Sequence, residues 1–104
     1  MNVLQDYLGR AIRLTDERLI HILEHPEMTG LEAAIEDAVA GPDRVVQSES
    51  DAEAQLYYRW RPATPVGDKY VCVVVKYHED DAFVITAYLT NSIKKGLQLW
   101  PSDA

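Results

Sequence analysis

The feature that most restricts the fold is a pair of β-strand patterns in the second half of the chain, at 70–78 and 82–90. Valine and aromatic residues dominate both segments, and such residues favour extended backbone. Only the acidic residues 79–81 separate the two segments, so we expect the strands to be antiparallel neighbours. A chain that contains this hairpin folds around an antiparallel sheet.

Helical patterns occupy the first half of the chain. Thr15 is a suitable N-cap for a helix at 16–24, whose first turn is acidic and so favours the helix dipole. Thr29 and Glu32 have the spacing of a capping box, which predicts a second helix that ends at Gly41. Shorter strands are predicted at 11–14, 44–48 and 56–61.

The order of these elements predicts one α+β domain over residues 1–104, with its core at about 10–100. A short N-terminal strand is followed by two helices and then by a run of strands, so we expect both helices to pack on one face of an antiparallel sheet. With 104 residues and 47% hydrophobic content, the chain has enough apolar residues for one core and no room for a second.

Composition indicates a cytoplasmic protein with no membrane partner. The longest apolar run, 71–75, is far shorter than the ~20 residues that span a bilayer. The first ten residues mix polar and apolar side chains, unlike a secretory signal. Cys72 is the single cysteine and cannot form an internal disulfide, which fits a reducing compartment.

The charge is distributed unevenly along the chain. The formal net charge is −7, which argues against a uniformly basic nucleic-acid-binding surface. Residues 1–54, however, carry −8 and residues 55–104 carry +1. A locally basic face in the strand-rich half is therefore compatible with an acidic protein.

Strand alternation predicts which side chains share the solvent face of the sheet. Side chains alternate between faces along a strand, and the more apolar set belongs under the helices. Cations, hydroxyls and aromatic rings then gather on the other face, a combination that suits a phosphodiester ligand. Ordinary solvent-facing sheets carry the same residue types. The predicted set is Lys76, His78, Thr86, Tyr88 and Thr90, joined by Tyr57, Arg59 and Arg61 if Leu56, Tyr58 and Trp60 point inward.

Several short motifs, in a fixed order, resemble one protein family over about residues 10–100. The family is the phage- and toxin-associated nuclease domains of the barnase/EndoU/colicin/RelE (BECR) group. The resemblance implies a curved sheet of about four antiparallel strands, as in RelE-like domains. The motifs are His21, His25-Pro26-Glu27, Pro42-Asp43-Arg44-Val45, Tyr57-Tyr58-Arg59, Val73-Val74-Val75-Lys76 and Phe83-Val84-Ile85-Thr86-Ala87-Tyr88.

The resemblance also implies an activity and roles for residues. It implies metal-independent RNA cleavage in which the 2′-hydroxyl attacks the neighbouring phosphate and leaves a cyclic phosphate. RNA would be the substrate, a cognate antitoxin or immunity protein a partner, and no cofactor or metal is expected. The implied catalytic residues are His21 as general base or acid, Arg59 and Lys76 as transition-state cations, and Thr86 and Tyr88 as hydroxyl groups that orient the phosphate; Tyr57, Arg61, Lys94 and Lys95 would bind RNA.

Two other functions remain open. The sequence His21-Ile22-Leu23-Glu24-His25 matches the H-x-x-E-H pattern of zinc proteases. Pro26, however, disfavours helical geometry at His25, so the two histidines need not share a helical face. The other alternative is a non-catalytic interaction or regulatory module, whose acidic helices bind a basic protein partner.

Overall fold

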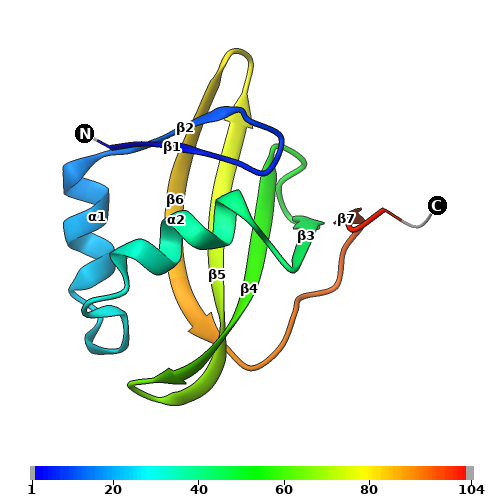
Figure 1. The fold of residues 1–104 in the computed structure, drawn as a ribbon. Coiled ribbons are helices and arrows are strands. Elements are labelled where there is room, and N and C mark those ends of the chain that lie inside the picture. The colour runs from blue at the N-terminus through cyan, green and yellow to red at the C-terminus, as the bar shows by residue number, and fades with distance from the viewer. Residues whose placement is uncertain (1, 103–104) are drawn as a thin grey trace.

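In the computed structural model, which describes residues 2–102, one seven-stranded mixed sheet is packed against helices (Figure 1). The strand order is β1-β2-β6-β5-β4-β3-β7. All neighbouring strands are antiparallel except β2 and β6, which are parallel. The strands are β1 (Asn2–Gln5), β2 (Ala11–Leu14), β3 (Arg44–Gln47), β4 (Ala54–Thr64), β5 (Gly67–His78), β6 (Asp81–Thr90) and β7 (Gln98–Trp100).

The expectation of about four antiparallel strands is therefore wrong, although the fold is α+β. Two of the additional strands, β1 and β7, are short and lie at the ends of the strand order. β1 pairs with β2 through a turn in which the Asp6 carboxylate accepts hydrogen bonds from the backbone N–H groups of Leu8 and Arg10, both at 2.9 Å. Gly9 supplies the left-handed backbone of that turn, with φ of 82°.

The predicted N-terminus of the first helix is confirmed, and that of the second helix is wrong. α1 (Asp16–Leu23) begins where Thr15 accepts a hydrogen bond from the N–H of Arg18 at 3.1 Å. A 3₁₀ helix, η1 (Pro26–Met28), follows, and α2 (Glu32–Ala40) begins after Leu31 rather than from a cap at Thr29. The capping box does not form because η1 and left-handed Gly30 (φ 79°) occupy the approach to α2. Neither of the α-helices described is long and apolar enough to cross a membrane.

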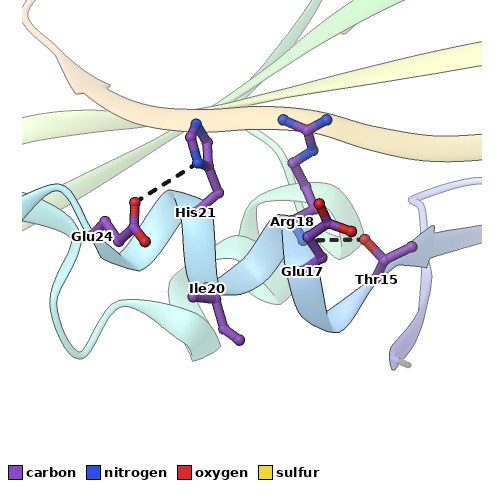
Figure 2. Close-up of a pocket in the computed structure, with 6 residues that line it drawn as sticks. All are labelled: Thr15, Glu17, Arg18, Ile20, His21 and Glu24. Carbon is purple, nitrogen blue, oxygen red and sulfur yellow. Dashed lines mark hydrogen bonds and ion pairs between the residues drawn. The ribbon is translucent and has the colours of Figure 1, made fainter.

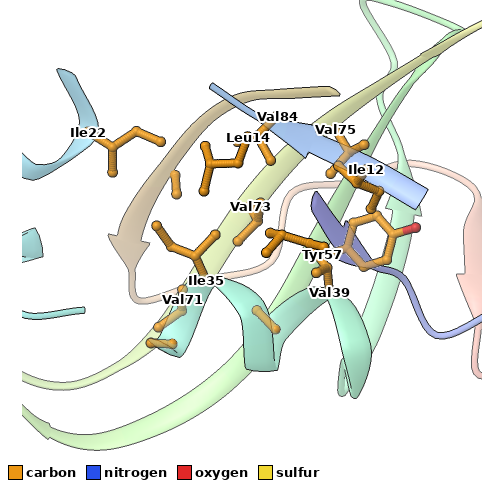
Figure 3. Packing of buried hydrophobic residues seen from close by; sticks show 14 of the residues in the cluster. Ile12, Leu14, Ile22, Ile35, Val39, Tyr57, Val71, Val73, Val75 and Val84 are labelled. Atoms are coloured by element: carbon orange, nitrogen blue, oxygen red, sulfur yellow. The ribbon is translucent and has the colours of Figure 1, made fainter. Parts of the chain in front are cut away.

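The main core lies between the helices and one face of the sheet, called here the covered face (Figure 3). α2, with Ile35 and Val39, packs against β5 and its buried valines, and α1, with Ile22, packs against β6. Burial of these side chains from water supplies the main driving force for folding. The opposite face, called the open face, carries a smaller cluster to which no helix contributes: Val46, Leu56, Tyr58 and Cys72.

Two local features decide which side chains reach each face. A β-bulge places one extra residue, Ile85, between the pairs Val74–Thr86 and Val75–Val84. The bulge reverses the alternation along β6, so Val84 is in the main core, whereas strict alternation directs Phe83 and Ile85 there. In β4, Tyr57 joins the main core and Tyr58 joins the open-face cluster. These assignments are the reverse of those that alternation alone predicts.

Candidate RNA-contacting surface

The open face brings Tyr58, Tyr88 and Lys94 together. The backbone N–H of Lys94 donates a hydrogen bond to the Tyr58 hydroxyl at 3.1 Å, and the Lys94 ammonium lies 5.9 Å from the centre of the Tyr88 ring. Burial raises the pKa of Tyr58 to about 12 and also raises that of Tyr88. Both phenols are therefore neutral at physiological pH. Thr86 lies on the same face of β6, opposite Val74.

Lys94 and Lys95 border a hollow of about 360 Å³ between the 91–97 loop and the 48–50 segment. Ser48, Ser50 and Leu56 line the same hollow, together with Glu49. The loop approaches β3 so closely that a Cβ at Gly96 would clash with the Gln47 carbonyl and the Val46 side chain. Across residues 2–102, neither lysine takes part in an ion pair, so both ammonium groups are free to meet an anion.

Aromatic rings extend the open face along β4 and β5. Trp60 is 46% exposed, and its ring centre lies 4.9 Å from that of Tyr70. Tyr70 in turn contacts the open-face cluster. Exposed aromatic rings beside cations are the surface type on which unpaired bases stack. Alternation predicts Trp60 inward, so sequence reasoning missed this ring.

Lys76 lies on the open face but is already paired. Its ammonium is 3.0 Å from a carboxylate oxygen of Asp51 and 3.9 Å from one of Glu53. The hydrogen bond to Asp51 and the attraction of that carboxylate raise the pKa of Lys76. His78 forms a further pair with Glu53 at 2.6 Å. This end of the open face is therefore locally neutralised, unlike the region around Lys94.

Arg59, predicted to be catalytic, and Tyr57 and Arg61, predicted to bind RNA, do not join Lys76 and Thr86 on the open face. Tyr57 is fully buried in the main core. Arg59 donates a hydrogen bond to the Gly41 carbonyl, an acceptor that the end of α2 leaves without a helical partner. Arg61 lines a cavity of about 20 Å³ with residues of α2. All three side chains lie on the covered face, because the side chains of β4 alternate in the opposite sense to the one predicted.

Asp6 organises a polar network beside Tyr57. Its carboxylate accepts hydrogen bonds from the Tyr77 hydroxyl at 2.8 Å and from Nε of Arg10 at 2.6 Å, and the Tyr57 and Tyr77 hydroxyl oxygens lie 2.5 Å apart. Burial opposes the charge on Asp6, but the donated hydrogen bonds outweigh it and lower the pKa. Burial raises the pKa of Tyr57 to about 12. The network stabilises the β1–β2 turn against β4 and β5.

His21 lies on the exposed surface of α1. Its Nδ1 is 3.8 Å from a carboxylate oxygen of Glu24, and Figure 2 shows the ring and the Arg18 side chain pointing toward β6, with Ile20 pointing the opposite way. Arg18 also shares a hollow of about 220 Å³ with Phe83 and Ile85. Sequence reasoning did not select Arg18, although its three-residue spacing from His21 places both on one helical face.

The H-x-x-E-H pattern does not form a paired-histidine site. α1 ends at Leu23, and His25 is the residue that precedes η1. Among the side chains described, no group of three or more His, Cys, Asp or Glu residues is placed to hold a metal ion. The ring of His21 instead pairs with Glu24.

No protein-family model matches the chain, and neither a curated protein nor a solved structure matches it.

Proposed function

We propose that the protein is a metal-independent endoribonuclease of the BECR group that binds single-stranded RNA on the open face of its sheet. The observation that carries the proposal is that the partly exposed Tyr88 ring adjoins Lys94, which shares a hollow with Lys95, and neither lysine has a carboxylate partner within residues 2–102. Lysines neutralise backbone phosphates, and bases stack on aromatic rings. Trp60 and Tyr70 extend the stacking surface along the sheet.

The proposed reaction is an internal transfer at phosphorus. A general base removes the proton of the 2′-hydroxyl, and the 2′-oxygen forms a bond to phosphorus. The bond to the 5′-oxygen breaks, and that oxygen takes up a proton, so the products are a 2′,3′-cyclic phosphate and a 5′-hydroxyl. His21 is the proposed proton-transfer group, because imidazole is the side chain most often used as a general acid or base and the His21 ring points toward β6.

Other residues of the site would bind and orient the phosphate. The Thr86 hydroxyl is a hydrogen-bond donor on β6, and Arg18 is a cation beside the same strand. We assign the transition-state charge to Arg18 rather than to Arg59, which bonds to the Gly41 carbonyl, and we assign Lys94 to binding the RNA backbone on the open face. Lys76 is left out of the reaction because Asp51 and Glu53 already neutralise it.

Cleavage of end-labelled RNA in EDTA tests the proposal. We expect the wild-type protein to cut single-stranded RNA or tRNA and to leave cyclic phosphate ends. His21→Ala should lower the rate by about 100-fold or more, the range for loss of a general acid or base. His25→Ala is the matched control, since His25 is also exposed but lies outside α1, and it should keep full activity. Intact RNA with every substrate, or equal loss in both variants, would contradict the proposal.

A non-catalytic interaction module is the second candidate, and the acidic first half of the chain favours it. Glu32 and Glu36 of α2 border a hollow of about 500 Å³ with residues of β1, and residues 1–54 carry a formal charge of −8. A basic peptide would find charge complementarity there. Tight binding of a lysine-rich peptide, lost in Glu32→Lys with Glu36→Lys, together with intact RNA, would favour this function.

A further inference from the structure

One side of β6 has a long stretch of unpaired backbone. β2 pairs with β6 at a single position, Arg13 opposite Phe83, and β2 ends one residue later at Leu14. Over residues 85–90, no strand of the described chain pairs with β6 on this side. These residues therefore present backbone donors and acceptors to an added strand.

Apart from the bulge at Ile85 and the packing of α1 against β6, this edge has no feature that would discourage strand addition. Natural edge strands carry charges, prolines or bulges that discourage pairing with another chain. Residues 86–90 read Thr-Ala-Tyr-Leu-Thr, without a charge, a proline or a glycine. The end strands β1 and β7 are only four and three residues long. β6 is therefore the edge best suited to accept a partner strand.

α1 places a cation beside the same edge. Figure 1 shows α1 next to β6 on the side away from β5, and Figure 2 shows Arg18 and His21 pointing from α1 toward β6. Arg18 and residues Phe83 to Ile85 line one hollow of about 220 Å³. Within the part of the chain that the structure describes, the Arg18 guanidinium makes no ion pair or hydrogen bond. A carboxylate on an added strand would supply its missing partner.

We propose that the 85–90 edge of β6, together with Arg18, docks an extended acidic segment of a protein partner as an additional strand. Backbone hydrogen bonds to β6 would supply affinity, and a peptide carboxylate bound by Arg18 would supply specificity. A second copy of this chain fits less well, because residues 85–90 of its own β6 contain no carboxylate to meet Arg18. The inference does not rest on the proposed ribonuclease function, because peptide binding is measured without RNA.

Two synthetic octapeptides test the proposal: one alternates Val and Glu, and the matched one alternates Val and Lys. We expect the Val/Glu peptide to bind at least about tenfold more tightly, the scale of one charge-assisted contact. Its binding should slow hydrogen exchange of the amides in 85–90. Arg18→Glu should reverse the preference between the peptides. Arg44→Glu, a charge reversal at another exposed arginine on β3, should leave the preference unchanged.

Three outcomes would overturn the proposal. The first is equal affinity for the two peptides, and the second is binding without protection of the 85–90 amides. The third is protection of these amides in the protein alone that rises with protein concentration, which would make a second copy the occupant. Because Arg18→Glu is an exposed substitution near the N-terminus of α1, where an acidic residue is favourable, we expect the variant to fold.

Discussion

The two faces of the sheet use their charged groups differently. On the covered side, Arg59 bonds to the carbonyl of Gly41, and the Asp6 carboxylate accepts from Arg10 and Tyr77. No buried polar side-chain atom in residues 2–102 lacks a hydrogen-bond partner. On the open face, Lys94 contacts the Tyr88 ring and has no carboxylate partner within the described residues.

The charged side chains of the covered side stabilise the fold, whereas the unpaired lysines of the open face are available to bind a ligand. A cation that already has a good partner loses that interaction when it binds a ligand, so its contribution to binding is small. Within the described residues, Lys94 and Lys95 have no ion pair to lose. A count of arginines and lysines in the sequence cannot make this distinction, because it depends on the partner of each cation.

Asp6→Ala should have the largest effect, and the effect should be on stability. The substitution leaves the Tyr77 hydroxyl, the Arg10 guanidinium and two backbone N–H groups without the Asp6 acceptor, and Tyr57 keeps only Gln55 as an acceptor besides Tyr77. We expect the free energy of unfolding to fall by about 3 kcal/mol, measured by urea denaturation. RNA affinity of the folded fraction should not change. A loss of stability below about 1 kcal/mol would mean that the network does not hold the fold.

Loss of both open-face lysines should affect binding and not stability. Lys94→Ala with Lys95→Ala removes two unpaired ammonium groups, and we expect RNA affinity to fall by about tenfold, with a weaker salt dependence. The unfolding free energy should change by less than about 0.5 kcal/mol, as for other surface substitutions. Fluorescence anisotropy with labelled RNA at two salt concentrations measures the affinity. Unchanged RNA affinity would show that the unpaired lysines of the open face do not bind RNA.

Acidification should destabilise the wild-type protein more than Asp6→Asn. The pKa of Asp6 is lower in the folded protein than in the unfolded chain, so its carboxylate stabilises the fold above the unfolded pKa of about 4. That stability is lost as the pH falls through the lower folded pKa. Asparagine does not titrate, so the stability difference between the proteins should shrink below about pH 4. The free energy of unfolding of both proteins is measured from pH 6 to pH 2. A constant difference between the wild type and Asp6→Asn over this range would show that ionisation of Asp6 does not stabilise the fold.

Lys76→Ala should have the smallest effect of the four. The ion pairs of Lys76 with Asp51 and Glu53 are partly exposed and screened by solvent, so we expect only a small loss in the free energy of unfolding. RNA affinity should change by less than about twofold, because the charge of Lys76 is already balanced. A tenfold loss of RNA affinity would instead place Lys76 in the binding surface. Denaturation and anisotropy, run beside the double lysine variant, measure both quantities.

Periodicity in the sequence predicted the elements whose pattern is local. The first helix and the 70–90 hairpin are confirmed because capping, apolar spacing and turn residues all lie within a few positions of each other. The strands β1 and β7 were missed because they are short and carry polar residues. Their place in the sheet depends on contacts with β2 and β3 rather than on their own pattern.

The faces of β4 and β6 could not be predicted from alternation. Leu56, Tyr57 and Tyr58 are consecutive and all buried, so their residue types do not indicate a face. The side of Tyr57 is set by the Asp6 network, and Asp6 lies 51 positions away in the sequence. In β6, the extra residue Ile85 changes the alternation halfway along the strand. The predicted position on the open face is therefore found where alternation held, at Lys76, Thr86 and Tyr88.

An NMR titration with a single-stranded RNA that carries 2′-O-methyl groups, and so cannot be cleaved, tests most directly whether RNA binds the open face. We predict that the largest chemical-shift changes occur at Thr86, Tyr88, Lys94 and Lys95, with the indole signal of Trp60 shifting as well. Shift changes concentrated on α2 and around Arg59, or no shift change at an RNA concentration that saturates cleavage, would contradict the account.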